Sequence, residues 1–197
     1  MHFRRAGIFC IPLFVAAFAL AFAITTVSPS TSVDAQTSTV RIMPLGDSIT
    51  THIPPYNSYR RPLWQMLNNA GYSVDFVGSR RVDDNNVLPP NPDFDLEYEG
   101  HPGWRVDNIL GSIRPWADAY DPDIVLVHLG TNDLIQGQSV DSTISELGQL
   151  IDTLRASNPN VTILMAQIIP FNRTNGQYVP TLNSRIASLV MSKNTSQ

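Results

Sequence analysis

Short apolar runs alternate with amphipathic segments from about residue 39 to about residue 191. Runs rich in Val, Ile, Leu and Phe that are short enough for β-strands occur at 39–46, 73–77, 123–129 and 161–166. Apolar residues recur at helical spacing in the segments that follow these runs, at about 58–70, 105–119, 140–156 and 180–191. The pattern predicts a chain in which strands and helices alternate.

The run 123–129 is apolar at almost every position, which is typical of a strand in the middle of a parallel sheet that helices cover on both faces. Strands that alternate with helices of this length are joined by right-handed βαβ crossovers. We therefore predict an α/β fold, a three-layer α/β/α sandwich around a parallel sheet. A long polar loop, 82–100, separates the second strand from the second helix.

The N-terminal segment differs from the rest of the chain. Two arginines precede an apolar stretch, 6–24, and small residues follow it. This order of charge, apolar stretch and small residues predicts a secretory signal peptide, 1–35, that is cleaved near Ala35 and leaves one secreted, extracellular domain, 36–197. The alternative is a retained membrane anchor, because the apolar stretch is nearly long enough to span a bilayer.

The composition is that of an ordinary globular domain, with 43% hydrophobic and 15% charged residues. The formal net charge is −4 and the arginines are scattered singly or in pairs, so we expect no nucleic-acid partner. We also expect no membrane partner once the signal peptide is removed. None of the histidines is paired by spacing with another type of metal ligand, so we expect no metal and no other cofactor.

Three polar segments carry the candidate chemistry. Gly46-Asp47-Ser48 follows the first strand, Gly100-His101-Pro102-Gly103-Trp104 ends the long loop, and Gly130-Thr131-Asn132-Asp133 follows the apolar run 123–129. In an open α/β sheet, ligands bind at the carboxyl ends of the strands. The hydroxyl of Ser48 is therefore a candidate functional group, since its segment breaks directly from a strand.

These segments, together with the run 74–79, resemble the SGNH (GDSL) hydrolases, particularly the carbohydrate-esterase branch that includes acetylxylan esterases. The resemblance extends over about 40–190 and implies a flavodoxin-like sheet and the hydrolysis of carboxylic esters. It implies that Ser48 is the nucleophile and that the oxyanion hole comprises the backbone N–H groups of Ser48 and Gly103 and the side-chain amide of Asn132.

The chemistry of ester hydrolysis agrees with these roles, because an acyl-enzyme mechanism needs an exposed nucleophile and donors aimed at the developing oxyanion. Alternatives remain open. The sequence also allows Ser48 to be only a turn residue and Asn132 to be only a loop cap. Gly100 could supply the oxyanion N–H in place of Gly103. The flanking carboxylates of Asp47 and Asp133 are expected to accept hydrogen bonds that fix the loops.

A substrate rim is a further hypothesis, since aromatic faces bury the apolar side of a sugar while Asp and Asn bind its hydroxyls. The candidate rim residues are His52, Tyr56, His101 and Trp104. The acidic loop 82–100 fits either this rim or an ordinary solvated surface. The alternative interpretation of His101 is a loop histidine with a structural hydrogen bond. His128 is interpreted as a buried, hydrogen-bonded histidine.

The catalytic base of the family is missing from this sequence. Family members carry it in an Asp-x-x-His segment near the C-terminus, and no histidine follows His128 here. A serine without an adjacent base is a weak nucleophile, so we expect weak or no activity. His52 is the best substitute base. We also expect the sheet to lack its last strand and helix, through an incomplete gene model, a splice product or a degraded reading frame, and the exposed edge to lower solubility.

The leading functional hypothesis is a secreted serine esterase that deacetylates plant-wall polysaccharide, with acetylated polysaccharide or a small ester as its substrate. A lysophospholipase or a general short-chain esterase is the alternative enzyme, because the same catalytic parts can serve it. A non-catalytic carbohydrate-binding protein is the alternative from another class, because a crevice without its base can still bind.

Overall fold

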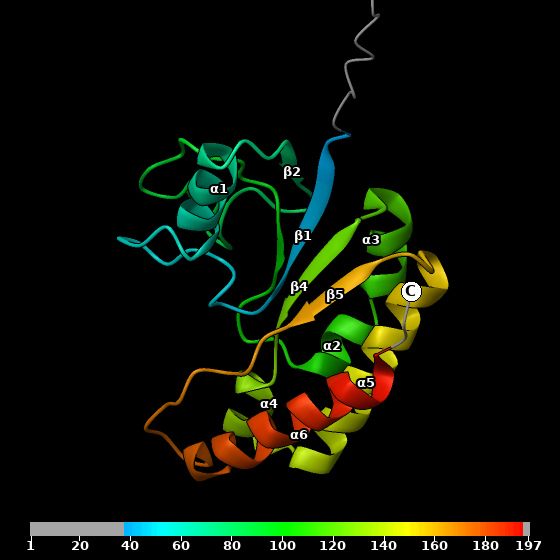
Figure 1. The fold of residues 1–197 in the computed structure, drawn as a ribbon. Helices are drawn as coiled ribbons and strands as arrows, with labels where there is room; N and C mark the ends of the chain where they lie inside the picture. The colour runs from blue at the N-terminus through cyan, green and yellow to red at the C-terminus, as the bar shows by residue number, and fades with distance from the viewer. Residues whose placement is uncertain (1–37, 195–197) are drawn as a thin grey trace, which may run out of the picture. The chain divides into compact units, whose positions relative to one another are not determined.

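The computed structural model describes residues 38–194, and the predicted signal peptide lies outside this range. The strands form a parallel sheet with the order β2-β1-β4-β5, in which β3 pairs with the end of β1 (Figure 1). The strands are β1 (Val40–Gly46), β2 (Val74–Phe76), β3 (Glu99–Gly100), β4 (Ile124–His128) and β5 (Thr162–Met165). This is the α/β sheet that the alternating pattern predicts.

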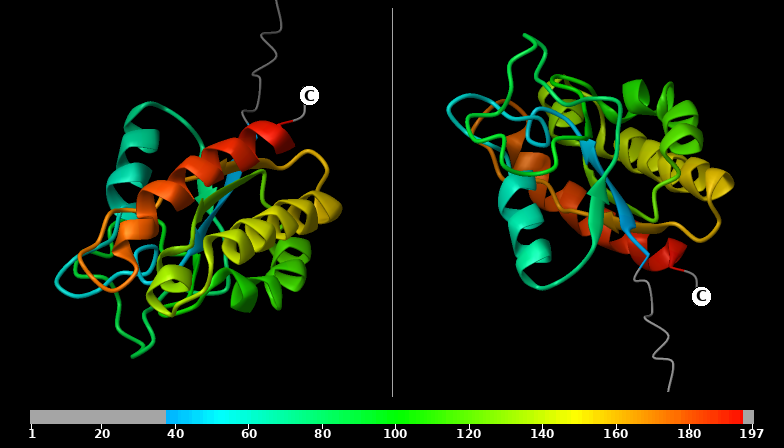
Figure 2. Two further views of the ribbon diagram at one scale, coloured as in Figure 1. Left: turned by 90° about the horizontal axis from the view of Figure 1, so that it is seen from below. Right: turned by 90° about the horizontal axis from the view of Figure 1, so that it is seen from above.

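Helices pack on both sides of the sheet, as Figures 1 and 2 show. They are α1 (Arg60–Asn69), α2 (Val106–Leu110), α3 (Ile113–Tyr120), α4 (Thr131–Ile135), α5 (Val140–Ser157) and α6 (Val179–Lys193), with a short 3-10 helix η1 (Gly176–Tyr178). Helices α2, α3, α5 and α6 cover one face, and α1 lies on the other side, next to β2. The three-layer α/β/α prediction is confirmed.

The main core lies between the sheet and the helices α2, α3, α5 and α6. Val125 and Val127 of β4 are buried there, because alternate residues of a strand point to the same face. The stripe of α5 that includes Leu147, Leu150 and Leu154 packs against them. Burial of these aliphatic side chains is the main stabilising contribution to this layer.

Three details of the secondary structure differ from the sequence-based expectation. The segment 105–119 forms two helices, α2 and α3, separated at Gly111 and Ser112. Helix α4 and strand β3 were not predicted, because each is too short to show a period in its side chains. Both short elements lie at the end of the sheet where the candidate site residues are found.

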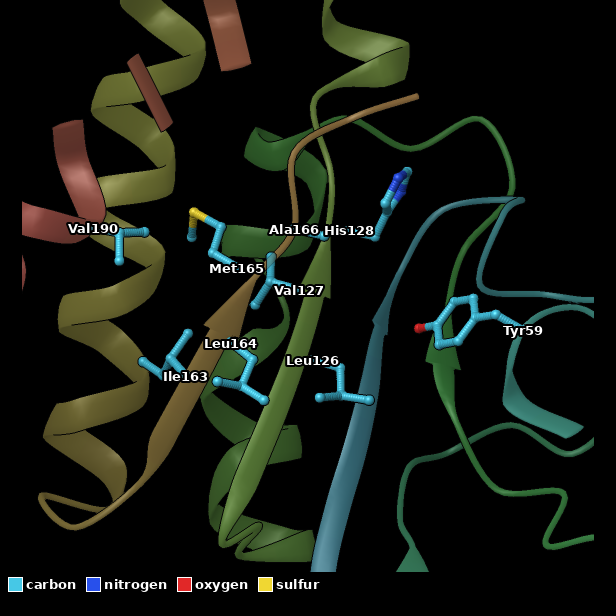
Figure 3. Close-up of a pocket in the computed structure, with 9 residues that line it drawn as sticks. All are labelled: Tyr59, Leu126, Val127, His128, Ile163, Leu164, Met165, Ala166 and Val190. Atoms are coloured by element: carbon cyan, nitrogen blue, oxygen red, sulfur yellow. The ribbon is translucent and has the colours of Figure 1, made fainter. Parts of the chain in front are cut away.

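The part of the sheet formed by β4 and β5 is left uncovered on the side of α1 within the described range. Leu164 of β5 is 54% exposed, while its neighbours Ile163 and Met165 pack against the core on the opposite face. A cavity of about 480 Å³ lies here, lined by Leu126, Leu164 and Tyr59 among others (Figure 3). No helix within residues 38–194 has the length and apolar character needed to cross a membrane.

Candidate active site

The loop after β1 holds Ser48 at the carboxyl end of the sheet. A Cβ atom on Gly46 would lie 2.2 Å from Oγ1 of Thr50 and 2.8 Å from the carbonyl oxygen of His128, so only glycine fits where this strand ends. Asp47 then closes the turn, because its Oδ1 accepts the N–H of Ile49 at 2.9 Å. Ser48 is half-buried, and its hydroxyl makes no hydrogen bond with residues 38–194.

The segment His101-Pro102-Gly103-Trp104 forms a tight turn that meets this loop. The N–H of Trp104 donates to the carbonyl of His101 at 3.2 Å, and Gly103 has φ +80°, which together with Pro102 is typical of a type II turn. The N–H of His101 donates to the carbonyl of Gly46 at 2.9 Å. The turn is therefore attached to the end of β1.

The exposed residue of this turn is Gly103, whereas Gly100 is buried in β3. A Cβ atom on Gly103 would meet no protein atom within 4 Å, so its backbone conformation, and not a lack of space, requires glycine. A Cβ atom on Gly100 would lie 3.0 Å from the backbone nitrogen of Thr51. Of the two candidate oxyanion donors, only Gly103 is on the surface.

Asn132 connects the loop and the turn. It lies in the first turn of α4, directly after β4, and its Nδ2 donates to the carbonyl of Trp104 at 2.9 Å and to Oδ2 of Asp47 at 3.4 Å. Gln136, one helical turn later, donates from Nε2 to the carbonyl of Gly103 at 2.7 Å. The three segments singled out in the sequence therefore converge, with the residue before Ser48 in contact with the amide of Asn132.

Two buried carboxylates support these loops, as expected. Burial raises the pKa of Asp47, while the N–H of Ile49 and the nearby His128 oppose this rise. Burial also raises the pKa of Asp133 to about 6, and its Oδ1 accepts the N–H of Val106 at the start of α2, at 3.2 Å. Both side chains therefore fix backbone segments around the site, which confirms the prediction for them.

His52 lies in the interior, only 1% exposed, although it was expected at the substrate rim. Burial and the nearby Arg60 lower its pKa, and Asp83 acts in the opposite direction. Neither ring nitrogen forms a hydrogen bond with residues 38–194. Its role as a substitute base stays a prediction that these contacts do not support.

The ring of His128 is buried at the end of β4 and lines the cavity, as Tyr59 also does (Figure 3). It was expected to be hydrogen-bonded, but neither ring nitrogen has a partner in the described part of the chain. The hydrogen bond is missing because the His128 side chain faces the uncovered side of the sheet. The apolar residues that precede and follow His128 in the sequence do not reveal which face its side chain takes.

The other rim candidates lie closer to the surface. Tyr56 is 73% exposed and Trp104 is half-buried, while His101 is 8% exposed and stacks against Trp104 with ring centroids 4.2 Å apart. Tyr56 and Trp104 therefore remain available to a substrate. The structure brings Ser48, Gly103, Asn132 and Trp104 to one edge of the sheet.

Most acidic side chains of the loop 82–100 are engaged within the domain. Their partners are arginine, histidine or backbone groups, in the pairs Arg80 with Asp84, Arg61 with Asp93 at 2.6 Å, Arg81 with Glu97 at 2.7 Å, His101 with Glu99 at 2.6 Å, and the N–H of Phe76 with Asp95 at 2.6 Å. These contacts favour a structural role for the acidic residues over direct sugar binding. Within residues 38–194, no group of three or more His, Cys, Asp or Glu side chains is arranged to hold a metal ion.

Sequence reasoning missed three side chains that support the site. Arg60 is fully buried beneath the nucleophile loop, Gln136 binds the turn, and Trp116 of α3 packs against His101 with ring centroids 4.8 Å apart. The position of Gln136 four residues after Asn132 was a usable signal, because such residues share a helix face. Nothing local in the sequence distinguishes Arg60 from a surface arginine.

Comparisons with known proteins agree with this fold. The model of the GDSL-like lipase/acylhydrolase family matches residues 45–191. A multidomain esterase from Ruminococcus flavefaciens is 31% identical over 148 residues, which are 67% of this chain and 19% of that protein, so the chain corresponds to a small part of this relative.

Solved structures that share 34% sequence identity with the chain include two esterases. One is a crystal structure of a mutant acetyl esterase with acetate ion, with a TM-score of 0.69, covering 80% of this chain and 75% of that one. The other is a family 3 carbohydrate esterase from Clostridium thermocellum, with a TM-score of 0.67, covering 79% of this chain and 72% of that one.

Proposed function

The chain belongs to the GDSL-like lipase/acylhydrolase family and is by family a carboxylic-ester hydrolase of the SGNH type, and from this premise we propose that it is a secreted enzyme that deacetylates plant-wall polysaccharide. The acetyl group is supported by the similarity to an acetyl esterase, and the carbohydrate by the similarity to a family 3 carbohydrate esterase. The exposed Tyr56 and half-buried Trp104 provide aromatic surface for a sugar.

The observation that carries this proposal is the convergence at Asn132. One N–H of its amide is bound to the carbonyl of Trp104, and the long 3.4 Å contact to Asp47 leaves the other directed toward the nucleophile loop. Together with the N–H of the exposed Gly103, the amide of Asn132 would donate to the oxyanion that forms when Ser48 attacks an ester carbonyl, and would give up its long contact with Asp47 to do so. Ser48 would carry the acyl group until water releases it.

The proton of Ser48 needs an acceptor, and none of the described histidines is bonded to this hydroxyl. We therefore propose that the 197-residue chain by itself turns over slowly. Stabilisation of the oxyanion and binding of the substrate alone leave on the order of 10³ to 10⁴ of rate enhancement over water in serine hydrolases that lack a triad member. Slow turnover that depends on Ser48 is the expected behaviour.

The test is hydrolysis of p-nitrophenyl acetate and of acetylated xylan by the purified full chain. Ser48→Ala should reduce turnover to background, and Asn132→Ala should reduce it by about a hundredfold or to the Ser48→Ala level, whichever is reached first. Ser188→Ala is the matched control, because Ser188 is exposed on α6 and its hydroxyl bonds only to its own helix. Equal rates for the wild type and Ser48→Ala would refute catalysis by this serine.

The free hydroxyl of Ser48 also favours a second candidate, a non-catalytic carbohydrate-binding protein. Here the crevice would bind acetylated xylan without hydrolysing it. Affinity electrophoresis with acetylated and deacetylated xylan distinguishes the two functions. Retardation by acetylated xylan that is the same for wild type and Ser48→Ala, with no hydrolysis by either, would support the binding protein and reject the enzyme.

A further inference from the structure

Gly103 is exposed and has no side chain that could hold the turn in place, and its carbonyl is bound by the exposed side chain of Gln136 at 2.7 Å. Its position matters, because an oxyanion donor acts only if its N–H lies at hydrogen-bond distance from the reacting oxygen. Buried side chains of neighbouring residues restrain the turn further, and the side chain of His101 makes both hydrogen bonds and ring-stacking contacts.

The imidazole of His101 is attached to the sheet through Glu99 of β3. Nε2 of His101 lies 2.6 Å from Oε1 of Glu99, and Nδ1 lies 3.5 Å from Nη1 of Arg80. A guanidinium can only donate, so Nδ1 accepts and Nε2 carries the proton that Glu99 accepts. This assigns the tautomer of the ring from its two partners.

Glu99 is itself rigidly held. Its side chain is fully buried, and it accepts the N–H of Ser79 at 2.8 Å and the hydroxyl of Ser79 at 2.9 Å. Its backbone pairs with Leu45 of β1, three residues before Ser48. Because buried carboxylates are costly unless hydrogen bonds satisfy them, the bond from His101 is part of what makes this buried group tolerable.

The His101 ring is stacked with two tryptophans. The Trp104 ring is stacked on it with a centroid distance of 4.2 Å and an angle of 22° between planes, and the Trp116 ring with 4.8 Å and 7°. Trp104 directly follows Gly103, and its carbonyl accepts the amide of Asn132. The ring of His101 therefore restrains the residue that touches both proposed oxyanion donors.

We propose that His101, oriented by Glu99 and stacked on Trp104 and Trp116, is a positioning residue that holds the N–H of Gly103 and the amide of Asn132 in register with Ser48. This role rests on the proposed function of the site. It differs from a place on the substrate rim, since His101 acts through Trp104 and its ring nitrogens point to Glu99 and Arg80 instead of into solvent.

The experiment compares variants of the full chain that separate stacking from hydrogen bonding. His101→Ala removes both, His101→Phe keeps an aromatic ring against the tryptophans, and His101→Gln keeps a donor for Glu99. Two quantities are measured below the melting temperature of every variant. These are kcat and KM for p-nitrophenyl acetate, and the order of the Gly103 amide, from its ¹⁵N heteronuclear NOE and its hydrogen-exchange rate.

Positioning predicts that His101→Ala lowers kcat by about 10- to 100-fold, the range in which a displacement of about 1 Å affects turnover, with KM changed less than about twofold. The Gly103 amide should lose order in the same variant. His101→Phe and His101→Gln should each restore part of both. Arg114→Ala on α3 is the control, because its exposed ion pair with Asp118 lies on the helix of Trp116 but not at the site.

A merely structural role predicts a different result, in which His101→Ala lowers the melting temperature but leaves both kcat and the order of Gly103 unchanged. That result would overturn the proposal. If His101→Ala does not fold, His101→Phe and Glu99→Gln answer the same question. If the wild type shows no turnover that depends on Ser48, the proposed function fails, and the NMR measurement still decides whether His101 orders the turn.

Discussion

Asn132 and Asp133 are adjacent in α4 but have separate tasks. Asn132 faces the nucleophile loop and donates to Asp47 and Trp104, whereas Asp133 is fully buried and accepts the N–H of Val106. The second oxygen of Asp133 has no hydrogen-bond partner within the described residues. A buried carboxylate with one free oxygen is stable in its protonated form, which explains the direction of its pKa shift.

The raised pKa of Asp133 predicts a dependence of stability on pH. Its pKa is about 6 in the folded protein, above the value of about 3.9 for an unfolded chain. As pH rises from about 4 to about 6, the unfolded state loses this proton first, so the free energy of unfolding falls. Asp133→Asn cannot ionise, so it removes this fall in the free energy of unfolding, and its side chain keeps an oxygen that accepts the N–H of Val106.

We expect Asp133→Asn to raise the free energy of unfolding by about 1 to 3 kcal/mol at pH 7.5 and to have little effect at pH 4. Urea denaturation at several pH values measures this difference. Asp118→Asn provides the comparison, because Asp118 is exposed and paired with Arg114 on the surface. A difference between Asp133→Asn and wild type that stays constant from pH 4 to pH 7.5 would contradict the assignment.

At the level of elements, the first residue of α1 joins this helix to the nucleophile loop. Arg60 is fully buried, and it donates to the carbonyl of Thr50 from Nε at 2.9 Å and to the carbonyl of Leu96 from Nη1 at 2.8 Å. Its guanidinium lies 3.8 Å from the centre of the Tyr98 ring, and burial lowers the pKa of Arg60 to about 10. The helix and two loops therefore share one buried cation.

Replacing this cation should destabilise the domain strongly. Arg60→Leu leaves two carbonyl oxygens without their donors, so we expect the free energy of unfolding to fall by about 3 kcal/mol or more. Arg61→Leu is the matched control, because Arg61 pairs with an exposed Asp93 and exposed ion pairs contribute little to stability. Chemical denaturation of both variants tests the contrast, and equal effects would refute it.

At the scale of the whole molecule, the described domain has an exposed apolar strand. Leu164 lies on the uncovered face of β5, and no described strand pairs with the other side of β5. Unpaired strand edges and exposed aliphatic groups favour association between copies. This arrangement agrees with the low solubility expected from the sequence, which stays a prediction until it is measured.

We expect Leu164→Thr to reduce self-association, because threonine keeps the preference for a strand and removes the aliphatic group. Sedimentation velocity over a range of concentrations measures the change. Met66→Thr is a control at another exposed apolar residue, on α1, and should have less effect because it lies away from the open edge. Association that is identical in wild type and Leu164→Thr would exclude this face as its cause.

The N-terminal segment gives a separate prediction for the whole chain. Expression in a secreting host should release a protein whose first residue is Gln36, because the small residues at 33–35 match a signal-peptidase site. Edman sequencing of the secreted product checks this. Recovery of the full-length chain in the membrane fraction would instead support the retained anchor.

The sequence by itself determined the alternation of strands and helices, the parallel sheet and the three segments that carry the candidate chemistry. These features depend on local periodicity and on short motifs, which are visible in neighbouring residues. The nucleophile loop and Asn132 could be predicted to meet because parallel strands end at a common edge, and the contact between Asp47 and Asn132 agrees with that expectation.

Only the tertiary structure decided which side chains support the site and which face of the sheet stays open. The burial of Arg60, the contacts of His101 with Glu99 and Trp116, and the exposure of Leu164 all depend on residues far apart in the chain. A buried arginine and a surface arginine have the same local sequence pattern, since burial is set by what packs against a residue after folding. The long-range contacts therefore carry the information that the sequence pattern lacks.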